Sequence, residues 1–155
     1  MENQNIFEAI IKETTIYHND HGLWDMSINM ELGEKQENTR VSYFIHSGKG
    51  RDVFETLDVY IGALKKVGLN GSEVVKKKYH FLIQDYLKVY DKIPESSSDE
   101  LMKKGSKIYK MSESVTKKLY GKKVNVQLKK FPLSCGDSNL VTQYNFILLS
   151  VINAV

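Results

Sequence analysis

The chain has only one cysteine and two prolines among its 155 residues. A single thiol, Cys135, excludes an internal disulfide framework and is typical of a reducing compartment. No apolar run approaches the roughly 18 to 20 residues that a membrane-spanning helix requires. The first residues are acidic and polar, unlike a secretory signal. From these absences we expect a cytoplasmic protein without a membrane span.

Positive charge is concentrated in one part of the chain. Residues 1–75 hold 7 basic and 12 acidic side chains, whereas residues 76–130 hold 15 basic and 6 acidic ones, a net charge of +9. A segment this basic favours an anionic partner such as nucleic acid. Because 20 of the 22 basic residues are lysines, a simpler interpretation is a surface that keeps the protein in solution.

Five segments have the pattern of strands. Residues 23–32 alternate strictly between polar and apolar side chains, as a half-buried antiparallel strand requires. Residues 6–18 are rich in β-branched side chains, and the turn residues that follow join the two segments into a hairpin. Further strands are predicted over 39–46, 123–129 and 142–151.

One helix has clear signals at both ends. Asp52, with Glu55 three residues later, is typical of a helix N-terminus. Apolar residues then recur at helical spacing until Gly68, which predicts the end of the helix.

The basic segment is harder to interpret. Residues 72–92 fit a helix, although residues 79–83 also alternate as a strand would. After a polar loop we expect a single turn over 99–104, closed by Gly105, and a short helix over 112–120.

Three strands, a helix and two more strands is the element order of the oligonucleotide/oligosaccharide-binding (OB) barrel. We therefore predict a mainly β protein with helices, an OB-fold-like five-stranded antiparallel barrel with a helix between strands three and four. It forms a single nucleic-acid-binding domain over 1–155, with 73–118 as a basic helical insertion. An open α+β sheet is the alternative.

Three short stretches also resemble a known family. Residues 119–126 (LYGKKVNV) form a short helix, Gly-Lys and Val-x-Val that lead into strand four, and residues 57–69 end in ALKKVGL. Residues 10–16 and 24–32 are similar to a first hairpin. In these features the chain resembles small phage single-stranded-DNA-binding proteins with an OB-fold. The resemblance implies sequence-tolerant binding of single-stranded DNA in phage DNA replication or recombination, in the host cytoplasm, with replication or recombination proteins as further partners.

Single strands are bound by a basic groove and by aromatic rings on which bases stack. If the apolar residues of strand 39–46 point inward, Arg40 and Phe44 must point outward. Packing of Phe44 beneath the insertion is the alternative. Trp24 is in register with core residues, although its place at the hairpin end leaves a binding role open. The predicted DNA-binding residues are Tyr17, Trp24, Arg40, Phe44, His46, Lys49, Arg51, Lys122, Lys123, Lys129 and Lys130.

Signals for catalysis or metal binding are weak. His18 and His21 have a ligand-like spacing, but the sequence supplies no dense set of further ligands. The glycine-rich residues 47–51 lack the spacing of a phosphate-binding loop, and no histidine lies near Cys135 in the sequence. We predict no enzymatic activity, no cofactor and no metal. The alternative function is a small phage protein-binding module that inhibits a host nucleic-acid enzyme or defence system. RNA is the alternative polymer, and self-association is left open.

Overall fold

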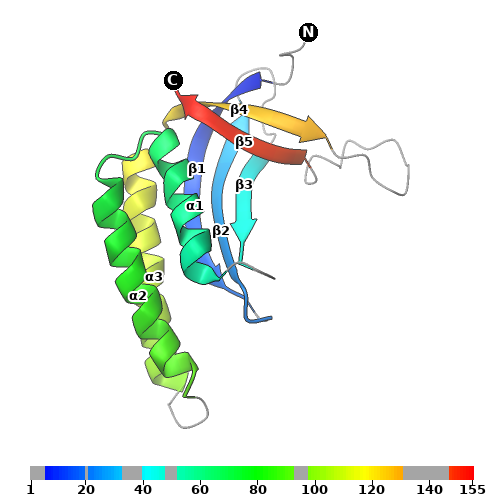
Figure 1. Cartoon of the computed structure of the whole chain (residues 1–155). Coiled ribbons are helices and arrows are strands. Elements are labelled where there is room, and N and C mark those ends of the chain that lie inside the picture. The colour runs from blue at the N-terminus through cyan, green and yellow to red at the C-terminus, as the bar shows by residue number, and fades with distance from the viewer. Residues whose placement is uncertain (1–5, 20, 33–39, 48–51, 93–97, 131–146) are drawn as a thin grey trace.

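Five strands and three helices make up the part of the chain that the structure describes. A computed structural model describes residues 6–19, 21–32, 40–47, 52–92, 98–130 and 147–155. In chain order the elements are β1 (Ile6–His18), β2 (Trp24–Leu32), β3 (Arg40–His46), α1 (Val53–Lys66), α2 (Ser72–Tyr90), α3 (Ser98–Leu119), β4 (Lys123–Lys130) and β5 (Ile147–Ala154) (Figure 1). None of these three helices combines the length and the apolar character that crossing a membrane demands.

The strands form one antiparallel sheet in the order β3-β2-β1-β4-β5. β1 pairs with two strands: residues 6–10 pair with β4, and residues 9–18 pair with β2. The sheet is strongly curved, and β4 and β5 cross near one end of the other three strands (Figure 1). Cα atoms of the two outer strands, β3 and β5, come within 8 Å of each other. Although they approach each other, β3 and β5 are the two ends of the strand order and are not paired with each other in the described residues, so the sheet is open. The fold is mixed α/β with a five-stranded antiparallel sheet.

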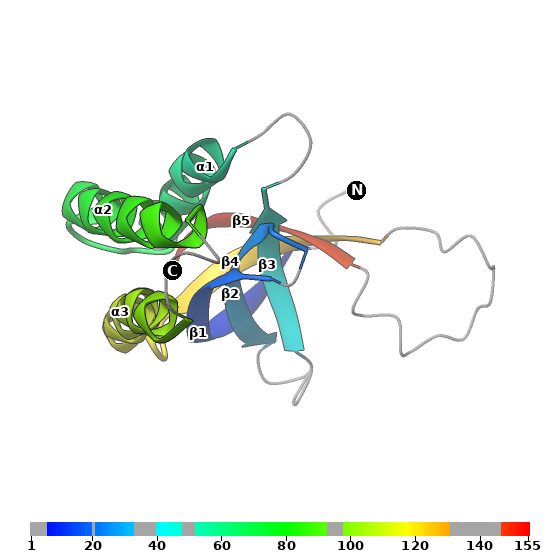
Figure 2. The same cartoon turned by 90° about the horizontal axis from the view of Figure 1, so that it is seen from below.

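The inner face of the sheet carries the core. On β2 every even-numbered residue from Trp24 to Leu32 is buried, as the alternation predicts. α1 covers this face (Figures 1 and 2), and the buried Tyr60 hydroxyl donates a hydrogen bond of 2.7 Å to the Ser27 carbonyl. The predicted start of α1 is confirmed, since the Asp52 carboxylate accepts a bond from the Glu55 amide at 2.9 Å.

α2 and α3 form a helical hairpin beside the sheet (Figures 1 and 2). The helix expected over 72–92 is confirmed as α2. The expected interruption at Gly105 is wrong, because α3 is one continuous helix. A Cβ at Gly105 would lie 3.6 Å from Cε2 of Tyr86. This glycine therefore lies where the two helices approach each other and does not end a helix.

α3 covers the part of β1 that β4 leaves unpaired. The Thr14 amide donates to Oγ1 of Thr116 at 2.9 Å, and that hydroxyl donates to the Thr14 carbonyl at 3.3 Å. Deeper in the same contact, the buried Tyr79 hydroxyl and Oγ of Ser112 lie 2.8 Å apart. These bonds satisfy polar groups that an open strand edge would expose.

The other strand predictions agree within a residue for β1 to β4. β5 differs, since it extends to Ala154, three residues beyond the expected end. The expected start of that strand, 142–146, lies outside the described residues. Buried side chains from the sheet and from all three helices belong to one core cluster.

Candidate functional site

The outer face of β1, β2 and β3 carries exposed aromatic rings. Register places Tyr17 of β1 and His46 of β3 on either side of Asp25, and Phe44 lies in the next row of the same face. Tyr17 is 57% exposed and Phe44 is 54% exposed. The ring centroids of Phe44 and His46 lie 5.6 Å apart. We call Tyr17, Phe44 and His46 the aromatic platform.

The side chains next to the aromatic platform are short and polar, and one of them, Asp25, is acidic. The hydroxyls of Thr15 and Ser27 lie 2.7 Å apart in the row that contains Phe44. Ser42 donates a hydrogen bond of 2.6 Å to the Asn29 side chain. Because these side chains bond to one another across the strands, they stay close to the sheet and leave the rings accessible.

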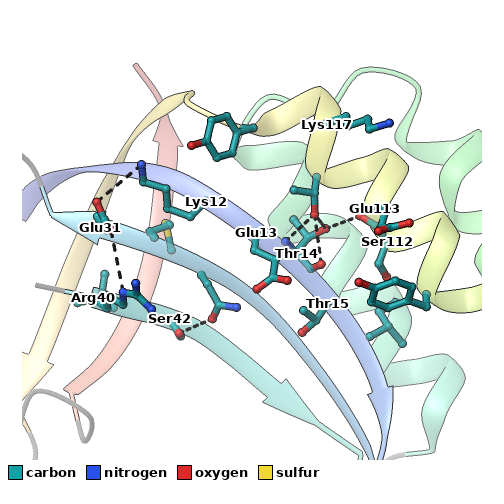
Figure 3. A pocket seen from close by; sticks show the side chains of 17 residues that line it. Lys12, Glu13, Thr14, Thr15, Glu31, Arg40, Ser42, Ser112, Glu113 and Lys117 are labelled. Carbon is teal, nitrogen blue, oxygen red and sulfur yellow. Dashed lines mark hydrogen bonds and ion pairs between the residues drawn. The ribbon is translucent and has the colours of Figure 1, made fainter. Parts of the chain in front are cut away.

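A groove of about 820 Å³ adjoins the aromatic platform. Its floor is the outer face of the three strands, including Thr15 and Ser42, which stand two residues before Tyr17 and Phe44 on their strands. α3 and the residue that follows it form the opposite wall, with Tyr109, Ser112, Glu113, Thr116, Lys117 and Tyr120 (Figure 3). Two of these wall residues, the tyrosines, are more than half exposed.

Charge within the groove is balanced. Its cations are Lys12, Arg40 and Lys117, and its anions are Glu13, Glu31 and Glu113. The Glu31 carboxylate lies 3.7 Å from Nζ of Lys12 and 4.0 Å from Nε of Arg40. Figure 3 shows this chain of ion pairs across the three strands. The groove alone therefore has no excess of positive charge. The feature that marks it as a candidate binding site is the set of exposed aromatic rings beside it.

Two adjacent lysines predicted to bind DNA point in different directions. Register aligns Lys123 with Ile10, Glu31 and Arg40, so it shares the outer face with Arg40, three strands away. Nζ of Lys122 would lie 3.7 Å from a Cβ at Gly68. Lys122 therefore lies beside the C-terminal end of α1 and is not part of the outer face.

The structure does not place the remaining predicted lysines and arginine at the site. Lys129 and Lys130 belong to β4 and pair with Leu148 and Ile147 of β5. Lys49 and Arg51 lie outside the described residues.

Trp24 is a core residue. It is only 4% exposed, and its ring stacks on His18 at 4.6 Å between centroids, with Tyr86 edge-on at 5.3 Å. The indole has no accessible face for a base, which removes Trp24 from the predicted DNA-binding residues. The alternative for Phe44, packing beneath the insertion, is likewise wrong because that ring is exposed.

His18 is part of an aromatic cluster that the sequence did not reveal. Its Nδ1 lies 2.9 Å from the Tyr86 hydroxyl, and Tyr90 packs edge-on against the ring at 4.7 Å. The described residues contain no group of three or more histidine, cysteine, aspartate or glutamate side chains arranged to hold a metal ion. His18 thus joins the first hairpin to α2.

Acidification is expected to weaken the fold through His18. Burial lowers the pKa of His18 from 6.5, and a hydrogen bond with the Gly22 backbone partly offsets this effect. Below about pH 6.5 the unfolded chain binds this proton more readily than the folded protein, so the free energy of unfolding falls as the pH falls. Urea denaturation between about pH 7.5 and 5.5 measures this loss.

The matched control is His18→Gln, which removes this titrating group and keeps a polar side chain at the same position. The difference between wild type and this variant isolates the His18 contribution. An identical pH dependence in both proteins would contradict the prediction.

Sequence reasoning missed the helical wall of the groove. Tyr109, Glu113, Thr116 and Tyr120 recur at positions i, i+4, i+7 and i+11, a spacing that places them on one helix face. The short helix expected over 112–120 contains Glu113, Thr116 and Tyr120, but the interruption expected at Gly105 left Tyr109 outside any predicted helix. A continuous helix would have predicted their common face.

Comparisons with protein-family models and with curated proteins find no match for this chain. The residues of the outer face are therefore the basis for assigning a function.

Proposed function

We propose that the outer face of β1, β2 and β3 binds single-stranded DNA with little dependence on sequence. The observation that carries this proposal is the aromatic platform, whose rings are exposed on a face of short polar side chains next to an open groove. Every base has a π-face, so stacking on such rings tolerates any sequence. The predicted role in phage DNA replication or recombination is part of the proposal.

The proposed fold is an OB-fold-like barrel that is partly closed. Three features support it: the strand order, the position of α1 between the third and fourth strands, and the approach of β3 to β5. In this fold the face of strands two and three binds oligonucleotides. Phe44 and His46 lie on that face, which makes it the expected path of the bound single-stranded DNA.

Affinity in this proposal comes first from stacking. Each base stacked on an aromatic ring contributes about 1 to 3 kcal/mol. The balanced charge of the groove means that phosphates must find cations outside it, such as Lys123 on the same outer face.

A protein partner is the second candidate. The groove's alternating ion pairs, with Glu31 between Lys12 and Arg40, suit a partner that carries both signs of charge. In that case the chain would inhibit a host nucleic-acid enzyme or defence system and would show negligible affinity for bare oligonucleotides.

Titration of a fluorescent oligo(dT) distinguishes the two candidates. We expect saturable binding at low salt that weakens as salt rises, because neutralised phosphates release counterions. An oligonucleotide of about 20 residues exceeds the 4 to 16 nucleotides that one OB domain covers. Matched RNA is the competitor that tests the polymer, since the 2′-hydroxyl distinguishes the two. Absence of binding at low salt would refute the proposal.

A further inference from the structure

α3 carries a row of exposed lysines that the groove does not explain. We call it the lysine stripe, and it consists of Lys103, Lys107, Lys110, Lys117 and Lys118. None of these lysines has an ion-pair partner within 4.0 Å among the described residues. Lys104 differs, since its ammonium lies 2.7 Å from the Asp85 carboxylate.

The stripe has a defined geometry on the helix. At 3.6 residues per turn its five lysines fall within about 100° of the helix circumference and extend over about 22 Å. Between Lys103 and Lys118, Ser114 is the one other residue in that sector. The stripe is therefore a row of positive charge without an acidic side chain in its sector, and Ser114 lies in the gap between Lys110 and Lys117.

The stripe borders the groove. Tyr109 lines the groove from the neighbouring face of α3, Tyr120 lines it directly after the helix, and Lys117 belongs to both the groove and the stripe. A DNA strand that leaves the groove past Lys117 would therefore next contact the ammonium groups of the lysine stripe.

We propose that the phosphates of the bound single strand continue along the lysine stripe, so that α3 sets the salt dependence of binding. This inference rests on the proposed function and adds to it a division of roles: rings on the sheet hold bases, and α3 holds phosphates. The groove has balanced charge, whereas the stripe has the charge that complements a phosphodiester backbone.

The test is a triple variant, Lys103→Gln, Lys107→Gln and Lys110→Gln, which removes three charges from exposed positions outside the groove. For single strands the slope of log affinity against log salt changes by about 0.7 for each phosphate contact. We expect the slope to become shallower by about 2 in this variant. Between 50 and 200 mM salt the wild type should therefore lose about 15- to 20-fold more affinity than the variant.

Matched controls separate this effect from net charge and from misfolding. Lys65→Gln, Lys66→Gln and Lys78→Gln remove the same charge from exposed positions on α1 and α2, and the wild-type slope is expected to persist. The triple Lys→Arg variant at 103, 107 and 110 keeps the charge and should also keep the slope.

Each outcome has one meaning. If the wild type binds oligo(dT) and both Gln variants change its slope equally, or neither changes it, the inference is wrong and the proposed function stands. If the wild type does not bind, the proposed function itself fails. If it binds vesicles with anionic headgroups through these lysines while the oligonucleotide slope is unchanged, the stripe is a membrane-binding surface and the inference is overturned.

Discussion

Phe44→Ala is expected to lower the affinity for oligo(dT) by about 5- to 150-fold, the equivalent of about 1 to 3 kcal/mol of lost stacking. The ring is 54% exposed and lies on the outer face of the sheet. Its removal should therefore leave the fold intact, since exposed substitutions usually change stability by less than about 0.5 kcal/mol. Fluorescence anisotropy at one low salt concentration measures the effect.

Phe81→Ala is the matched control for this prediction. Phe81 is also an exposed phenylalanine, at 63%, but it lies on α2 and does not line the groove. We expect its affinity to equal that of the wild type. Adding Tyr17→Ala to Phe44→Ala should weaken binding further, because Tyr17 belongs to the same aromatic platform. Equal affinities for the Phe44 and Phe81 variants would contradict the account of the site.

Trp24→Ala is expected to destabilise the fold by about 3 to 5 kcal/mol, the usual cost of removing a large buried aromatic side chain. Trp24 is 4% exposed, and both His18 and Tyr86 pack against its ring. The cavity would lie between the first hairpin and α2, so the contact between the sheet and the helical hairpin would weaken. Urea denaturation followed by circular dichroism measures this loss.

Trp24→Phe tests the same residue without a large cavity. It should lose less stability than the alanine variant and retain its affinity for oligo(dT), because the account places Trp24 in the core and not in the site. A folded Trp24→Phe protein that no longer binds the oligonucleotide would return Trp24 to the binding residues.

The sequence predicted the sheet well because a strand's alternation directly encodes which face is buried. On β2 the even-numbered residues are all core residues, and on β3 the exposed position of Phe44 follows from the same rule. The start of α1 was also predictable, since the Asp52 cap is an interaction between residues close in sequence. Local signals of this kind do not depend on the rest of the fold.

The groove was not predictable because it depends on contacts between distant residues. α3 reaches the sheet through Thr14 and Thr116, which are 102 positions apart. Gly105 is a helix breaker by local preference, yet close packing against Tyr86 accommodates it inside a continuous helix. Tertiary contacts therefore determine the continuous helix that forms the wall of the groove, whereas local sequence signals predicted an interruption at Gly105.

The distribution of charge in the sequence also predicted only part of the candidate site. The basic segment indicated an anionic partner, but the groove itself pairs its cations with glutamates. The exposed lysines of α3 lie beside the groove and not within it.

Photochemical crosslinking tests the central claim most directly. An oligo(dT) with halogenated uracil at defined positions, irradiated in complex with the full chain, attaches to aromatic side chains that stack on its bases. Mass spectrometry then identifies the attached residues. We expect crosslinks at Phe44 and Tyr17, whereas crosslinks confined to other parts of the chain would contradict stacking of bases on the aromatic platform.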